Sequence, residues 1–95
     1  MLKRDRYDAL RKRIPHIQKP NMLAVTASID ALPDKMQILK QVKDFNTFTV
    51  GNDPYHEHDF GSIDTEHGKV FWKIDDYGGQ EGLELVLTVM LAEEY

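Results

Sequence analysis

Apolar and polar residues alternate along two neighbouring segments, residues 60–66 (FGSIDTE) and 69–75 (KVFWKID). A period of two places the apolar side chains on one face of an extended strand. In the second segment these side chains are Val70, Trp72 and Ile74. His67 and Gly68 separate the segments, and glycine readily adopts the positive φ that a two-residue turn requires. The pattern therefore predicts a β-hairpin with one buried face.

Three further segments have patterns typical of strands. Residues 83–91 (LELVLTVML) carry leucine or valine at every second position, which predicts a long central strand buried mainly on its leucine face. Residues 22–29 (MLAVTASI) are apolar and include three β-branched side chains, so we expect a strand that is at least half buried. Residues 46–50 (NTFTV) predict a short strand or an extended segment.

Two segments have helical spacing instead. Residues 33–45 begin with Pro33, which suits the first turn of a helix, and we expect one apolar face to form the core. That face comprises Met36, Leu39, Val42 and Phe45, with Ile38 beside them. Residues 3–14 carry a narrow apolar stripe among arginines and predict a helix that ends at Ile14, because Pro15 follows. The stripe comprises Tyr7, Leu10 and Ile14.

These elements predict an α+β fold. An antiparallel sheet of about four strands carries the 33–45 helix on one face, with the N-terminal helix beside it. The 95 residues have the size of one domain, and no Gly/Ser-rich or Pro-rich linker divides them. Because so short a chain buries a limited share of its surface, we expect shallow sites or flat binding surfaces.

Charge divides the chain into two parts. Residues 1–20, the helix and a proline-bounded connector, have a net charge of +5, whereas residues 21–95 have a net charge of −9. An acidic body repels the nucleic-acid backbone, so DNA or RNA binding would depend on the N-terminal helix. Its candidate phosphate-binding residues are Arg4, Arg6, Arg11, Lys12 and Arg13. The alternative is a solvated helix whose arginines face the acidic surface of the body.

The absence of cysteine excludes disulfides, thiolate zinc sites and cysteine nucleophiles, and it favours the reducing cytoplasm. The N-terminus, MLKRDRYDALRKR, lacks the apolar run of a signal peptide. The longest apolar run elsewhere, residues 89–92, is too short to cross a bilayer. We therefore expect a cytoplasmic protein without membrane contact.

Residues 52–61 (NDPYHEHDFG) concentrate the candidate chemistry. In an extended segment, His56 and His58 would lie on one side and the acids between and after them on the other. Two imidazoles and a carboxylate suit zinc or another divalent ion, so His56, His58 and Asp59 are the candidate metal ligands.

A structural interpretation of the same segment stands beside the metal site. Asn52, Asp53 and Asp59 are residue types that hydrogen-bond backbone amides and hold tight turns, and Pro54 would stiffen such a turn. In this interpretation His58 is partly buried and hydrogen-bonded, and no cofactor is required.

An acid–base enzyme would use His58 beside one of its neighbouring acids. The chain lacks a glycine-rich phosphate loop and a serine nucleophile elbow, which favours a protein without catalytic activity. A third set of candidates is an acidic face that presents carboxylates to a basic groove of a partner protein. Its residues are Asp75, Asp76, Glu81, Glu84, Glu93 and Glu94. The alternative is a solubilising surface.

Three motifs, NDPYHEHDFG, VFWKIDDY and LTVMLAEEY, resemble those of a family of small bacterial proteins of unknown function. The family pattern runs close to FTxxNDPYGEHDFG, FWKIDYYD and LTIMLAxEY, and the resemblance covers about residues 22–95. It implies a mobile genetic element, such as a plasmid or phage, and implies no catalytic activity. Two departures stand out: His56 replaces a glycine, and residues 78–82 replace a longer acidic, proline-containing insertion.

These features lead to three functional hypotheses. The first is a non-enzymatic binding protein of a mobile element that occupies a surface of a host or phage protein and counters host defence, for instance by inhibiting a nuclease or a CRISPR-type complex. The second is a small metal-dependent enzyme or metal-binding module centred on His56, His58 and Asp59. The third is nucleic-acid binding through residues 1–14.

Overall fold

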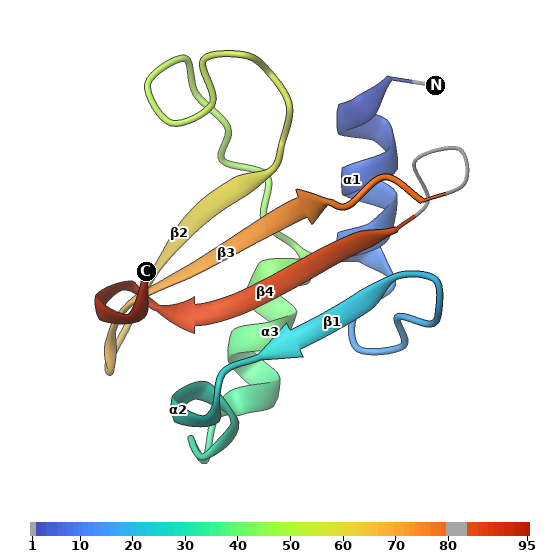
Figure 1. The fold of residues 1–95 in the computed structure, drawn as a ribbon. Helices are drawn as coiled ribbons and strands as arrows, with labels where there is room; N and C mark the ends of the chain where they lie inside the picture. The colour runs from blue at the N-terminus through green and yellow to red at the C-terminus, as the bar shows by residue number, and fades with distance from the viewer. Residues whose placement is uncertain (1, 80–83) are drawn as a thin grey trace.

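The computed structural model describes residues 2–79 and 84–95 and confirms the α+β fold (Figure 1). Its helical elements are α1 (Lys3–Lys12), α2 (Ala27–Asp30), α3 (Lys35–Lys43) and the 3-10 turn η2 (Ala92–Glu94). Its strands are β1 (Met22–Val25), β2 (Phe60–Thr65), β3 (Gly68–Asp76) and β4 (Leu85–Leu91).

The four strands form one mixed sheet in the order β1-β4-β3-β2. The β2/β3 and β3/β4 pairs are antiparallel, whereas β1 runs parallel to β4. The expectation of a wholly antiparallel sheet is therefore wrong at β1. A long connection that includes α2, α3 and the β2–β3 hairpin separates the two strands, and such a connection permits parallel pairing where a tight hairpin does not.

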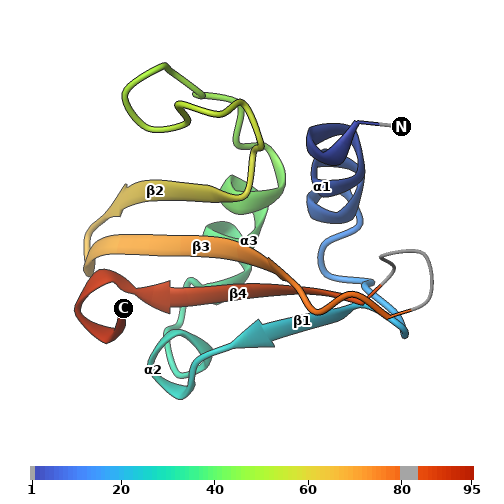
Figure 2. The same ribbon diagram turned by 45° about the horizontal axis from the view of Figure 1, so that its top comes forward.

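One face of the sheet forms the core, and both α1 and α3 lie against it (Figure 2). The predicted alternation is confirmed in the two central strands, where every second residue is buried. These residues are Val70, Trp72 and Ile74 in β3 and Leu85, Leu87 and Val89 in β4. Leu83, with which the predicted strand began, lies outside the described residues. From α1 the core receives Tyr7 and Leu10, and Ile14 follows from the turn after that helix.

Three of the predicted elements have clearly different bounds. The N-terminal helix ends at Lys12 instead of Ile14, because the chain already turns over residues 13–15, which include Pro15. The strand expected over 22–29 ends at Val25, and the chain turns into α2, which buries Ile29 completely. The main helix is shorter than 33–45, and its core face contains Ile38, Leu39 and Val42. Met36, expected on that face, is 55% exposed. Met36 lies in the first turn of α3, on a different side of the helix from Ile38 and Val42.

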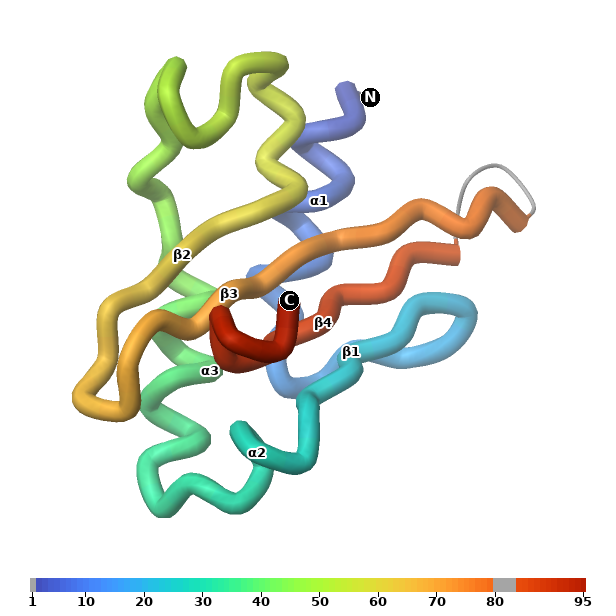
Figure 3. The backbone as a smooth tube through the Cα atoms, turned by 60° about the vertical axis from the view of Figure 1, so that its left-hand side comes forward, coloured from blue at the N-terminus to red at the C-terminus, as the bar shows by residue number. Residues whose placement is uncertain are grey.

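Smaller differences affect the connections. The β2–β3 turn consists of Glu66 and His67, one residue earlier than predicted, and Gly68 has a φ of +99° at the start of β3. Residues 46–50 form no strand and enter a loop that rises beside α1 (Figure 3). No helix of the described part of the chain is long and apolar enough to span a membrane.

Candidate functional site

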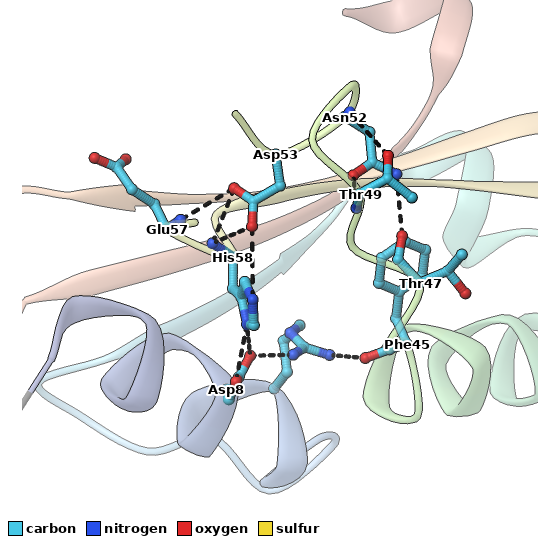
Figure 4. Close-up of polar contacts among 9 residues, drawn as sticks. Asp8, Phe45, Thr47, Thr49, Asn52, Asp53, Glu57 and His58 are labelled. Carbon is cyan, nitrogen blue, oxygen red and sulfur yellow. Dashed lines mark hydrogen bonds and ion pairs between the residues drawn. The ribbon is translucent and has the colours of Figure 1, made fainter. Parts of the chain in front are cut away.

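Residues 46–59, here called the histidine loop, project beyond the end of the sheet (Figure 1). The side chain of Asn52 holds the first half of this loop (Figure 4). Its Oδ1 accepts a hydrogen bond from the Thr49 N–H at 2.7 Å, and its Nδ2 donates to the Thr47 carbonyl at 3.0 Å. Thr49 Oγ1 in turn accepts the Asn52 N–H at 3.2 Å.

Asp53 stabilises the second half of the loop by accepting hydrogen bonds from its backbone. Its side chain is buried, and Oδ1 accepts the Glu57 N–H at 3.0 Å. The His58 N–H lies 3.3 and 3.4 Å from the two carboxylate oxygens. Hydrogen bonds to backbone amides compensate for much of the cost of burying the carboxylate. These contacts agree with the structural interpretation of Asn52 and Asp53.

His58 connects the loop to α1. Its Nδ1 lies 2.9 Å from both carboxylate oxygens of Asp8, and its Nε2 lies 3.5 Å from Asp53 Oδ2 (Figure 4). The imidazole also stacks on Phe48, with ring centroids 3.8 Å apart and planes 3° from parallel. Both ring nitrogens therefore already face carboxylates of this chain.

Arg11 extends the same network into the core. It forms an ion pair with Asp8, and Nη1 donates to the carbonyls of Phe45 at 2.8 Å and Val42 at 3.3 Å. Those carbonyls lie at the C-terminal end of α3, where the helix dipole favours a cation. The guanidinium also lies over the rings of Trp72 and Phe48, at 4.9 and 5.3 Å from their centroids.

The predicted metal ligands are not arranged as the extended segment required. His56 and His58 have φ values of +55° and +56°, so the backbone is left-handed at both positions and the segment is not extended, as the predicted sidedness required. His56 is exposed, and His58 faces Asp8. Asp59 is partly buried, and burial, followed by the nearby charge of Glu57, raises its carboxyl pKa. Metal binding by these residues stays a prediction that the geometry does not favour.

The predicted basic and acidic surfaces also differ from expectation. Arg11 is only 2% exposed, so it is not available to a phosphate, whereas Arg4, Lys12 and Arg13 are exposed. Arg6 lies 3.6 Å from Asp76, a contact between the helix and the acidic body.

The described acids lie at both ends of β4 instead of forming one face. Asp75, Asp76 and Glu84 lie where β3 ends and β4 begins, whereas Glu93 and Glu94 follow the end of β4 (Figure 1). Asp75 contacts Lys73, and Glu94 accepts hydrogen bonds from Thr26 and the Leu91 N–H. Glu81 lies outside the described residues.

The roles of Asp8 and Arg11 were not predicted from the sequence. A signal for Arg11 was present: it lies four residues after Tyr7 and three before Ile14, on the apolar stripe of the helix. A charged residue at such a position is a candidate for a buried, paired cation. No comparable signal pointed to Asp8, because its partner His58 is 50 residues away in the sequence.

Comparison with known proteins adds a family without an assigned activity. No curated protein and no solved structure matches the chain at a significant level. The sequence model of one family, DUF3768, matches residues 25–85. Because this match spans well over half of the chain, the protein belongs to DUF3768, a family of proteins of unknown function.

Proposed function

We propose that the protein is a non-enzymatic binding protein that contacts a partner protein through the histidine loop. The observation that carries this proposal is the combination of an internally hydrogen-bonded loop with two exposed apolar side chains on it. Val50 is 75% exposed and Tyr55 is 81% exposed. Aromatic side chains are frequent among the residues that dominate the energy of protein interfaces.

The rigidity of the loop supports a binding role. Asn52, Asp53 and His58 hold it at its base, and the Asp59 carbonyl accepts the Ile74 N–H at 2.8 Å, which ties its last residue to β3. A loop that is already ordered loses little conformational entropy when it binds, so more of the contact energy contributes to affinity.

The network around His58 supports a binding protein over an enzyme. A general base needs a nitrogen directed at a substrate proton. Here Nδ1 and Nε2 of His58 lie against Asp8 and Asp53, and Arg11 forms an ion pair with the same Asp8 carboxylate. Surface hollows of about 520 and 660 Å³ lie between α3, β2 and the first residues of the loop, and beside the start of β4, and His58 lines neither of them.

The resemblance to proteins of mobile elements suggests the class of partner. We extend the proposal to a host or phage protein, with inhibition of a defence nuclease or a CRISPR-type complex as its specific form. The acids at the two ends of β4 do not make one mimic of a nucleic-acid backbone. The acidic body instead supports electrostatic steering towards a basic partner, which raises the association rate.

The test begins with a pull-down from nuclease-treated host lysate, followed by a titration of the identified partner in purified form. The Val50→Ser/Tyr55→Ser variant should bind at least about tenfold more weakly, because truncation of an aromatic side chain that dominates an interface removes about 2 kcal/mol or more, and about 1.4 kcal/mol corresponds to tenfold in affinity. Tyr77→Ser is the matched control, since Tyr77 is 66% exposed but lies after β3, outside the loop. Equal affinity of the loop variant and the wild type would contradict the proposal.

A further inference from the structure

A second cluster of metal-ligating side chains lies at the end of β2 that is farther from the histidine loop. Within residues 2–79 and 84–95, Asp34, Glu66 and His67 are the one group of three such side chains with ligand atoms all within 4.8 Å of one another. Asp34 precedes α3, whereas the other two form the β2–β3 turn. Only folding brings these residues together.

The distances in this cluster suit a single small cation. His67 Nε2 lies 2.8 Å from Asp34 Oδ1 and 3.7 Å from Glu66 Oε1. Tetrahedral zinc holds nitrogen and oxygen ligands at about 2.0–2.2 Å, which places two ligands of one ion about 3.4 Å apart. One observed separation is shorter than that value and the other is longer, so small side-chain rotations would bring both ligand pairs to the spacing that zinc requires.

Local contacts favour the observed arrangement of the ligands. Thr65 Oγ1 accepts the His67 N–H at 3.0 Å and donates to the Gly68 carbonyl at 2.7 Å, which closes the turn. Asp34 is the residue before α3, yet its side chain makes no capping hydrogen bond to the helix. Its carboxylate is therefore directed at His67 instead of at the backbone of α3.

Neighbouring cations do not compete for these carboxylates. Lys35 pairs with Asp30, and Lys69 pairs with Asp64, each at 2.8 Å. A hollow of about 260 Å³ lies on one side of His67 and is also lined by Lys69 and Glu93.

We propose that Asp34, Glu66 and His67 form a binding site for a divalent transition-metal ion, with zinc as the best match. One imidazole nitrogen and two carboxylates are ligands that zinc accepts, whereas calcium and magnesium prefer oxygen ligands alone. Three protein ligands leave one position for water or for a side chain of a partner protein. The ion would link the β2–β3 turn to the start of α3.

The test is a titration of untagged protein with zinc by calorimetry, with cobalt absorption as a second measurement because tetrahedral cobalt absorbs visible light. We expect one ion per chain. His67→Gln and Asp34→Asn should each weaken binding at least about tenfold, since even loss of a residue that supports a metal ligand has that effect. Glu66→Gln should also weaken binding, and its side chain is 77% exposed, so the change should leave the fold intact.

His56→Gln is the matched control, because it makes the same change at an exposed histidine of the histidine loop. It should keep the affinity of the wild type. Failure of the folded wild type to bind zinc or cobalt would overturn the proposal. Zinc binding that survives His67→Gln would also overturn it, and loss of binding in His56→Gln would assign the ion to the histidine loop instead.

Discussion

Gly61 lies directly against the indole of Trp72, its partner across the β2/β3 pair. A Cβ at this position would lie 2.2 Å from Trp72 Nε1, and the indole is fully buried in the core. We therefore predict that Gly61→Ala lowers the free energy of unfolding by about 1–3 kcal/mol, the usual effect of overpacking a core. Urea denaturation measures this change.

Gly51→Ala provides the control for that substitution. The nearest atom to its new Cβ would be Thr49 Oγ1 at 3.8 Å, an ordinary contact. Its effect should stay within about 0.5 kcal/mol. Equal stability of the two alanine variants would show that Trp72 can adjust to a Cβ at position 61.

His56 stands where related proteins are expected to have glycine, and its φ of +55° gives the physical reason. A left-handed backbone costs a residue with a Cβ about 1–2 kcal/mol relative to glycine. The greater freedom of glycine in the unfolded chain offsets about 0.4–1 kcal/mol of this difference. We predict that His56→Gly raises the free energy of unfolding by up to about 1 kcal/mol.

The control for this prediction is His16→Gly, since His16 is an exposed histidine without a positive φ. There the substitution should leave stability unchanged or lower it, because only the unfolded-state effect operates. The denaturation midpoint should therefore rise for His56→Gly and stay the same or fall for His16→Gly. A lower midpoint for His56→Gly would mean that the imidazole makes a stabilising contact.

Asp59 carries a carboxyl whose pKa is raised in the folded protein, first by burial and then by the charge of Glu57. Because the folded pKa exceeds the unfolded pKa, ionised Asp59 destabilises the fold at neutral pH and protonation removes that effect. We predict that Asp59→Asn raises the denaturation midpoint at pH 7. The gain should shrink as the pH falls through the raised pKa towards about 3.9, the ordinary value of the group.

The control is Asp64→Asn, because the Asp64 side chain is 84% exposed and its pairing with Lys69 is a surface contact. Such a pair contributes about 0–1 kcal/mol, so its loss should lower the midpoint slightly. A gain from Asp59→Asn that is the same at pH 4 and pH 7 would contradict an electrostatic cause.

At the scale of the elements, the side chain of Arg11 connects α1 to α3. Arg11 joins this helix to the end of α3 through the carbonyls of Val42 and Phe45, and to Asp8 through an ion pair. Arg11→Leu leaves these groups without their cation in a buried site, which typically costs about 3–5 kcal/mol. We predict a loss of that size, measured by chemical denaturation.

Arg13→Leu makes the same change at an exposed position just after α1. It should alter stability by no more than about 0.5 kcal/mol. Similar losses in both variants would mean that the ion pair and the cation–π contacts of Arg11 contribute little.

For the whole molecule, the basic N-terminal segment is part of the core and not a separate arm. Tyr7, Leu10 and Ile14 are each at most 3% exposed, and full burial of such side chains stabilises a protein by about 1.5–3 kcal/mol each. Their sum is comparable with the total stability of a small domain. We predict that deletion of residues 1–14 abolishes cooperative unfolding, which near-ultraviolet circular dichroism of Trp72 would report.

Retention of a wild-type midpoint by the truncated protein would contradict this prediction.

Because residues 1–14 contribute to the core, their deletion is a poor test of nucleic-acid binding. Replacement of the exposed Arg4, Lys12 and Arg13 by glutamine is the better one, since it removes charge from the surface and leaves the core residues in place.

Local sequence patterns were sufficient to predict the elements with the clearest periodicity. The β2–β3 hairpin, the buried alternation of β4 and the helix near 33–45 all follow from local patterns, because each buries one regular face. The sequence also indicated that Asn52 and Asp53 hold a turn, since their side chains bond to backbone amides a few residues away.

Tertiary structure decided what depends on contacts between distant segments. Nothing local shows that His58 meets Asp8, that His67 meets Asp34 or that β1 pairs in parallel with β4. Ile29 became a core residue of α2, although its β-branched side chain favoured a strand, because burial outweighs intrinsic propensity. Periodicity predicts which face of a segment is buried. The residues that each buried or charged group contacts depend on how distant segments pack together.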